Sequence, residues 1–157
     1  MSKLIKLLVL FAIIGLATFL VLRRWLVEQA SPLPDNLGVV DGRLAPCPDS
    51  PNCVSTFATD TEHGIAPLAY DGNTAVAQAA ILAILQAQPS YTLINNDPAY
   101  IHATARSAFW GFIDDVEFYF DEAAGLIHFR SASRLGYGDG GVNRRRMEEI
   151  RKLYENR

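Results

Sequence analysis

Charged and histidine side chains gather on two predicted strands in the second half of the chain. Side chains alternate between the two faces of a strand, so Asp115 and Glu117 share one face of the first strand. On the second strand, His128 and Arg130 share a face in the same way. Carboxylates and a histidine on one face of a sheet could donate and accept protons during a reaction. We therefore take Asp115, Glu117 and His128 as the candidate catalytic residues.

A simpler interpretation of the same charges remains open. The turn sequence DEAAG between the two strands predicts an antiparallel hairpin, which would place acids opposite arginines. Such cross-strand pairs contribute about 0.2–1 kcal/mol each. The two acids could then form salt bridges with Arg106, Arg130 and Arg134, while Asp114 faces the apolar side. The polar face is therefore either a solvated surface laced with ion pairs or a face that binds a ligand.

A glycine-rich loop, GYGDGGVN, follows the second strand and leads into three consecutive arginines. Glycine permits close backbone approach, and Asn143 is suited to cap a helix that begins at Arg144. Arginines in a first helical turn conflict with the partial positive charge of a helix N-terminus. Either nearby acids or a bound anion would resolve the conflict. The candidate ligand-binding residues are Arg130, Arg134, Gly140, Gly141, Asn143, Arg144 and Arg145.

The sequence lacks several familiar catalytic and nucleotide-binding motifs. The glycine-rich loop has neither the spacing nor the lysine of a phosphate-binding loop, and it does not match the dinucleotide fingerprint. No G-x-S-x-G elbow is present, and Ser131 and Ser133 alternate away from His128. We expect no cofactor.

Cys47 and Cys53 are the two cysteines of the chain, and they bracket two prolines in the segment CPDSPNC. No C-x-x-C is present and no nearby histidine completes a zinc set, so we expect no metal site. A small disulfide loop is expected if the domain lies outside the cytoplasm. Two buried thiols are the alternative.

Residues 1–27 predict an N-terminal transmembrane anchor. An uncharged run of sixteen residues, LLVLFAIIGLATFLVL, is followed by Arg23 and Arg24. Flanking apolar residues extend it towards the roughly 20 residues that cross a bilayer. A cleavable signal peptide is the alternative, but RRW is a poor cleavage site. The positive charges at the N-terminus favour a single-pass topology with the soluble domain outside the cytoplasm.

The remaining sequence predicts one domain of the α+β class. Residues 28–43 are interpreted as a linker and 44–157 as the domain. Helices at about 74–88 and from residue 144 are expected to cover one face of an antiparallel sheet of four or five strands. The net charge of −3 gives no field that would attract nucleic acid.

Several separated blocks of the sequence carry a family resemblance. The segments CPDSPNCVS, FIDDVEF and RSASRLGYGDGGVNRRR stand in order, and the helix follows them. Together they resemble the domain of unknown function 1499 family over roughly residues 44–155. The resemblance implies that the cysteine loop and the arginine-rich segment belong to one domain. It implies no activity.

These observations favour a membrane-anchored, non-catalytic domain that binds a small anionic or polar ligand, with lipid headgroups among the candidates. An enzyme that uses Asp115, Glu117, His128 and Arg130 is the second hypothesis. A module that docks an acidic partner protein is the third.

Overall fold

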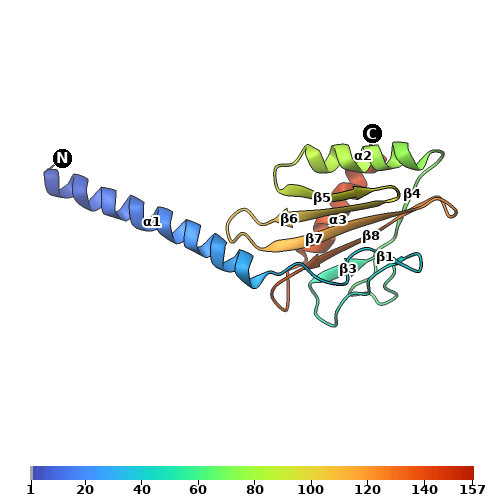
Figure 1. Ribbon diagram of the computed structural model, residues 1–157, viewed down its shortest axis with the longest axis horizontal. Coiled ribbons are helices and arrows are strands. Elements are labelled where there is room, and N and C mark those ends of the chain that lie inside the picture. The colour runs from blue at the N-terminus through green and yellow to red at the C-terminus, as the bar shows by residue number, and fades with distance from the viewer. Residues whose placement is uncertain (1) are drawn as a thin grey trace.

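Helix α1 (Lys3–Ala30) projects away from the rest of the chain in the computed structural model, which describes residues 2–157 (Figure 1). Ser2 caps its first turn by accepting a hydrogen bond from the backbone N–H of Ile5. None of the 28 helical residues is buried. The helix ends at Ala30, three residues beyond the anchor of residues 1–27 that the sequence predicted.

A six-stranded antiparallel sheet forms the centre of the domain, and the predicted α+β class is confirmed. Its order is β3-β8-β7-β6-β5, and β4 pairs with the same edge of β8 as β3 does. Both short strands add to the four longer ones, which explains a sheet larger than expected. The strands are β3 (Cys53–Ser55), β4 (Leu68–Ala69), β5 (Tyr91–Asp97), β6 (Tyr100–Arg106), β7 (Ile113–Asp121) and β8 (Leu126–Ser133).

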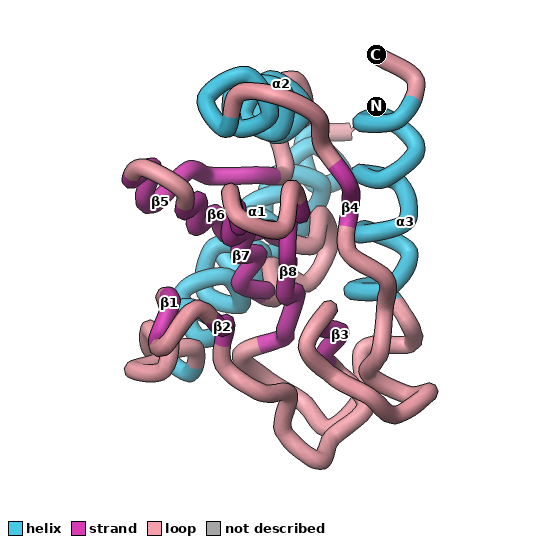
Figure 2. Tube along the Cα trace, turned by 90° about the vertical axis from the view of Figure 1, so that its right-hand side faces the viewer, coloured by secondary structure: helices cyan, strands magenta, loops and turns pink. Residues whose placement is uncertain are grey.

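Helices α2 (Thr74–Gln86) and α3 (Val142–Glu155) cover one face of this sheet, and Figure 2 shows them on the same side. The alternation of β7 and β8 directs their aromatic side chains into this layer. Burying each large side chain stabilises the fold by about 1.5–3 kcal/mol. The core includes Ile81 and Leu85 of α2, Phe118 and Phe120 of β7, Phe129 of β8, and Met147, Ile150 and Tyr154 of α3.

The opposite, polar face of the sheet is covered by the chain itself. The segment 31–44, which begins at the end of α1, crosses this face and includes the ribbon of β1 (Val39–Val40) and β2 (Arg43–Leu44). Gly38 donates its backbone N–H to the Glu117 carboxylate across the sheet at 2.8 Å. The stretch expected to be a linker therefore lies bound against the domain.

Helix α3 begins at Val142, and the prediction that it starts at Arg144 with Asn143 as its cap is wrong. Gly141, with φ of +76°, is the cap residue. Asp139 supplies the acceptor instead: its carboxylate accepts the backbone N–H of Gly141 and that of Asn143, each at 2.7 Å. An acid of the loop therefore occupies the N-terminus of α3, which agrees with the alternative in which nearby acids offset the arginines.

Candidate functional site

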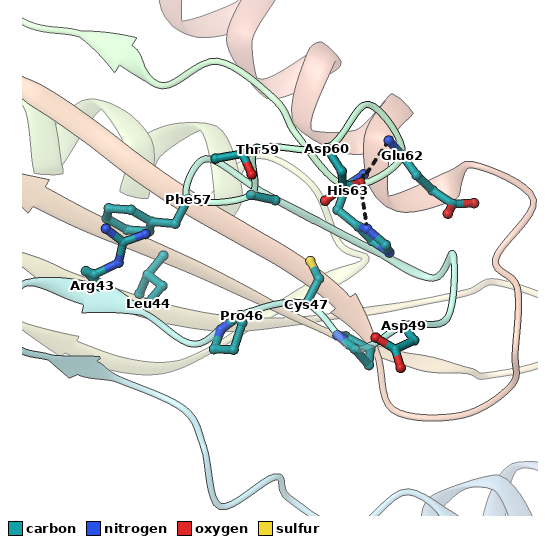
Figure 3. A pocket seen from close by; sticks show the side chains of 12 residues that line it. Arg43, Leu44, Pro46, Cys47, Asp49, Phe57, Thr59, Asp60, Glu62 and His63 are labelled. Carbon is teal, nitrogen blue, oxygen red and sulfur yellow. Dashed lines mark hydrogen bonds and ion pairs between the residues drawn. The ribbon is translucent and has the colours of Figure 1, made fainter.

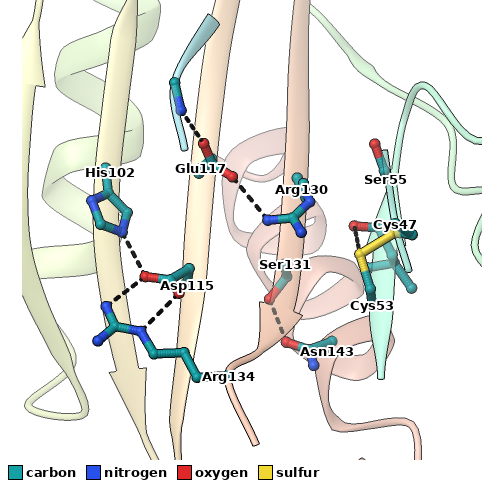
Figure 4. Close-up of polar contacts among 12 residues, drawn as sticks. Cys47, Cys53, Ser55, His102, Asp115, Glu117, Arg130, Ser131, Arg134 and Asn143 are labelled. Carbon is teal, nitrogen blue, oxygen red and sulfur yellow. Dashed lines mark hydrogen bonds and ion pairs between the residues drawn. A yellow bond between two sulfur atoms is a disulfide. The ribbon is translucent and has the colours of Figure 1, made fainter. Parts of the chain in front are cut away.

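Asp115 lies in a buried ion-pair cluster on the polar face of the sheet (Figure 4). Its carboxylate accepts two hydrogen bonds from the Arg134 guanidinium and one from His102 Nε2, all at 2.8 Å. Arg134 also donates to the backbone carbonyl of Ser31, at the end of α1. Arg134 thus links the buried acid to the junction between the helix and the domain.

Glu117 forms a second cluster two residues further along β7, where it is fully buried. One carboxylate oxygen accepts from the Tyr100 hydroxyl at 2.8 Å, as well as from Gly38. The other accepts from Arg130 at 3.1 Å, across the β7–β8 register that pairs the two residues. The salt-bridge interpretation of the charged face therefore describes these contacts well.

The pKa values on this face follow from burial and pairing. Burial alone would raise the pKa of Asp115, but the hydrogen bonds from Arg134 and His102 hold it below its usual value. Burial and the neighbouring Glu117 carboxylate raise the pKa of the Tyr100 hydroxyl, which stays protonated as a donor. Asp115 is 1 % exposed and Glu117 is 0 % exposed, so both carboxylates pair with groups inside the protein.

His128 stands apart from the two carboxylates with which it was grouped. Its Nδ1 lies 3.1 Å from the Thr56 hydroxyl. Its ring stacks on Phe57, with 4.2 Å between ring centroids, and on Tyr119 at 6.1 Å. Burial lowers the pKa of His128. The three candidate catalytic residues share a face, but each is held by different neighbours.

A further buried cluster lies on the helix-covered face, around Asp114. Arg146 donates to the Asp114 carboxylate at 2.5 Å, and Ser133 donates to the other oxygen. Asn143 joins them: its side-chain oxygen accepts from Ser131 and Arg146, and its amide group donates to Ser133. Asn143 therefore connects α3 to β8 instead of capping the helix.

The other two arginines in the first turn of α3, Arg144 and Arg145, face a small pocket. Arg144 donates to the backbone carbonyl of Glu62, and Arg145 donates to that of Gly140. Among residues 2–157, neither guanidinium has a carboxylate partner within ion-pair distance. The pocket has a volume of about 210 Å³. We call it the arginine pocket, and its lining is Pro51, Cys53, Val54, Glu62, Asp139, Gly141, Arg144 and Arg145.

A disulfide joins Cys47 to Cys53, as the sequence predicted, and excludes the alternative of two free thiols. Cys53 lines the arginine pocket, while Cys47 lines a larger cavity of about 690 Å³ (Figure 3). In that cavity, Asp60 accepts from the backbone N–H and the Nδ1 of His63, and the backbone hydrogen bond lowers the pKa of Asp60. His63 Nε2 contacts the Ser50 carbonyl, so both ring nitrogens are engaged within the loop.

No arrangement of three metal-ligating side chains occurs within the described stretch 2–157. The sequence model of the family described as "Protein of unknown function (DUF1499)" matches residues 43–153, which is most of the chain. This chain belongs to the DUF1499 family. The search of curated proteins gave no match. The matched stretch begins in β2, so α1 and the segment after it lie outside the DUF1499 match.

Asn52 explains why the separated motifs of the DUF1499 domain occur together. Its backbone carbonyl accepts from the Asn143 side chain and from the backbone N–H of Ser133. Its side-chain amide donates to the Gly136 carbonyl at 2.6 Å. The CPDSPNC loop is thereby fastened to β8, to the glycine-rich loop and to α3. Sequence reasoning missed Asn52, because no periodic pattern links it to Asn143 across a separation of 91 positions.

Apart from Asn143, which lies in the cluster around Asp114, the structure separates the candidate ligand-binding residues into two groups. Arg130 and Arg134 belong to the buried clusters of the polar face. Gly141, Arg144 and Arg145 line the arginine pocket, with Gly140 beside them through its carbonyl contact. The second group alone presents guanidinium groups to open space.

Proposed function

We propose that this DUF1499 protein is a single-pass membrane protein whose domain binds a small phosphate-bearing anion in the arginine pocket. One observation carries the ligand proposal: Arg144 and Arg145 line one pocket and contact only backbone carbonyls within the described chain. An arginine guanidinium matches the geometry of a phosphate through paired N–H donors. The other clustered arginines already have carboxylate partners.

The apolar surface of α1 supports the membrane tether. The helix is long and apolar enough to cross a bilayer, and its apolar window is entirely unburied. Twenty-eight residues span about 42 Å at 1.5 Å per residue, which exceeds a hydrocarbon core of about 30 Å. A core helix of a soluble protein would bury one face, and a cleavable signal sequence would not be expected to continue as helix into domain contacts. The ion pair between Arg106 and Glu28 is one such contact.

The position of the arginine pocket favours a ligand near the membrane. The N-terminus of α3 follows the end of β8, and that end of the sheet faces α1 (Figure 1). A phosphate group on a lipid would approach from that side, and a soluble phosphate ester would reach the same donors from solution. The ligand chemistry is the same in both cases, so the source is decided by experiment.

Two acids also line the arginine pocket, and they define its selectivity. Asp139 is already committed to the backbone N–H groups of Gly141 and Asn143. Glu62 is exposed and forms no ion pair within residues 2–157. We therefore expect Glu62 to weaken anion binding through repulsion.

Thermal unfolding of the full chain in nonionic detergent tests this proposal. Inorganic phosphate and micellar phosphatidylglycerol are titrated separately, and a ligand at 100 times its Kd stabilises the folded state by about 2.7 kcal/mol. Arg144→Ala and Arg145→Ala should remove the shift in Tm. Lys152→Ala, which removes one positive charge elsewhere on α3, should keep it, and Glu62→Gln should enlarge it.

The two titrants distinguish the two sources of phosphate. A response to phosphatidylglycerol alone identifies a lipid headgroup, and a response to inorganic phosphate identifies a soluble ligand. Absence of both responses in the parent, or a response that survives in both arginine variants, overturns the pocket assignment. An unchanged shift in Glu62→Gln would show that Glu62 does not repel the bound anion.

We also propose that the domain lies outside the cytoplasm, which the Cys47–Cys53 disulfide supports because such bonds persist in oxidising compartments. Reporter fusions after residue 157 test the topology. A periplasmic reporter should be active, and an active cytoplasmic reporter with a silent periplasmic one would reverse the orientation.

A further inference from the structure

Three aromatic side chains project from the loop between β6 and β7. Phe109 is 60 % exposed, Trp110 is 51 % exposed and Phe112 is 42 % exposed. Phe109 and Trp110 contact each other edge to face, with ring centroids 4.9 Å apart. Exposed aromatic clusters of this kind are unfavourable in water and mark surfaces that meet a partner or a membrane. The ligand-binding proposal makes no use of them.

The aromatic loop, residues 107–112, lies against the end of α1. The Arg23 guanidinium stands 4.4 Å from the Phe109 ring centroid and 5.5 Å from that of Trp110. Gly111 adopts a φ of +78°, and a Cβ built there would lie 3.3 Å from Arg24 Cγ. The loop therefore packs closely on the turn of α1 that carries the two arginines.

These contacts fix the depth of the loop relative to the apolar part of α1. The uncharged run ends at Leu22, and Arg23 and Arg24 are the first charged residues after it. Arginines at the end of a membrane span extend their guanidinium groups to the headgroup level. An aromatic loop that stacks on Arg23 must lie at that level too, which is where tryptophan is enriched in membrane proteins.

The guanidinium of Arg23 is held beneath the aromatic loop. Its Nε and Nη1 atoms are buried, and they have no hydrogen-bond partner within residues 2–157. Buried guanidinium N–H groups are normally satisfied. Here the Phe109 and Trp110 rings lie within cation–π distance of the guanidinium instead. The loop is therefore fastened to Arg23 and shares its depth beside the apolar run of α1.

We propose that the aromatic loop is a second membrane contact, which inserts Phe109, Trp110 and Phe112 into the lipid interface beside α1. The inference rests on the proposed tether, because α1 sets the depth. The loop contacts α1 at Arg23 and Arg24, directly beside the apolar run of the helix, and this position favours lipid over a protein partner. With two contacts, the domain holds a fixed tilt, and the sheet end that carries the arginine pocket faces the headgroups.

Tryptophan fluorescence in the full chain tests the proposal, because the chain has two tryptophans, Trp25 and Trp110. The Trp25→Phe variant reports on the loop, and Trp110→Phe reports on the helix. Each is reconstituted into phosphatidylcholine vesicles that contain lipids brominated at a shallow or at a deep acyl position. We expect quenching of Trp110, with the shallow label quenching it at least twice as strongly as the deep label.

A matched control places the probe at the far end of the sheet. The turn between β7 and β8 contains exposed Ala123 and lies opposite the aromatic loop (Figure 1). The nine residues of β7 separate them by about 26 Å. Ala123→Trp, made in a chain with both natural tryptophans changed to phenylalanine, should escape quenching by either label.

The outcomes separate the loop proposal from the tether proposal. Quenching of Trp25 without quenching of Trp110 overturns the loop contact and leaves the tether intact. Loss of quenching at both positions overturns the tether and with it the inference. A second copy of the chain could cover the loop instead. In that case Trp110 would be shielded equally in detergent and in brominated vesicles, and the chain would cross-link in a concentration-dependent way. That result also overturns the lipid contact.

Discussion

Arg134 and Arg144 carry the same charge and differ in what surrounds it. Arg134 is held between Asp115 and the Ser31 carbonyl on the covered face of the sheet. Arg144 borders a pocket and contacts one backbone carbonyl. A buried charge needs a partner to offset its desolvation, whereas a cation at the surface is solvated and free to bind. The comparison therefore separates arginines that maintain the fold from arginines that can recognise a ligand.

The same comparison explains why the polar face resembled a binding face in the sequence. Asp115 and Glu117 are two positions apart, and Arg130 and Arg134 are four apart. This even spacing correctly predicted one charged face. Segment 31–44 then covers that face, and its backbone groups complete the pairing. The charged residues of this sheet face therefore line an internal contact. The accessible arginines lie beyond the end of β8.

Arg134→Ala should give the largest effect, because it leaves the Asp115 carboxylate buried without its strongest partner. Removing one member of a buried ion pair costs about 3–5 kcal/mol. Urea unfolding of the full chain in detergent measures the change in the free energy of unfolding. Asp115→Asn in the same background should recover part of the loss. If Arg134→Ala lowers the free energy of unfolding by less than an ordinary surface substitution does, Arg134 does not maintain the fold and belongs with Arg144.

Removal of the disulfide should have an intermediate effect and sharpen the comparison. Cys47→Ser with Cys53→Ser opens a loop of sequence separation 6, which costs about 2 kcal/mol by the chain-entropy model. Because Cys53 lines the arginine pocket, the phosphate response should weaken as well. Unfolding with and without phosphate measures both effects. An unchanged free energy of unfolding would contradict the structural role of the bond.

The contribution of His128 to the pH dependence of stability should be smaller than the two effects above. Burial lowers its pKa from 6.5, so the unfolded chain takes up the proton first as the pH falls. Stability from the neutral ring is complete above pH 6.5 and is lost as the pH drops through the folded-state pKa. His128→Phe keeps the stacking on Phe57 and should flatten the stability profile below neutrality. Equal slopes in parent and variant would show that other groups control this range.

Local rules predicted much of the fold and part of the candidate site. The period of two identified both faces of β7 and β8, and the helix predicted at about 74–88 is α2. The start of α3 was misplaced because Asp139 competes with Asn143 for the role of cap, and both are good caps by type. The two classes of arginine could not be told apart, since the partners come from segments distant in sequence.

The arginine pocket is the central claim, and one paired measurement tests it most directly. The Arg144→Ala/Arg145→Ala double variant and the parent are titrated with phosphate by calorimetry, and the same samples are unfolded in urea. We predict phosphate binding by the parent, none by the double variant, and a free energy of unfolding within about 0.5 kcal/mol of the parent. A double variant that loses about 1–3 kcal/mol of stability, from a parent that binds no phosphate, would contradict the account and assign these arginines to the scaffold.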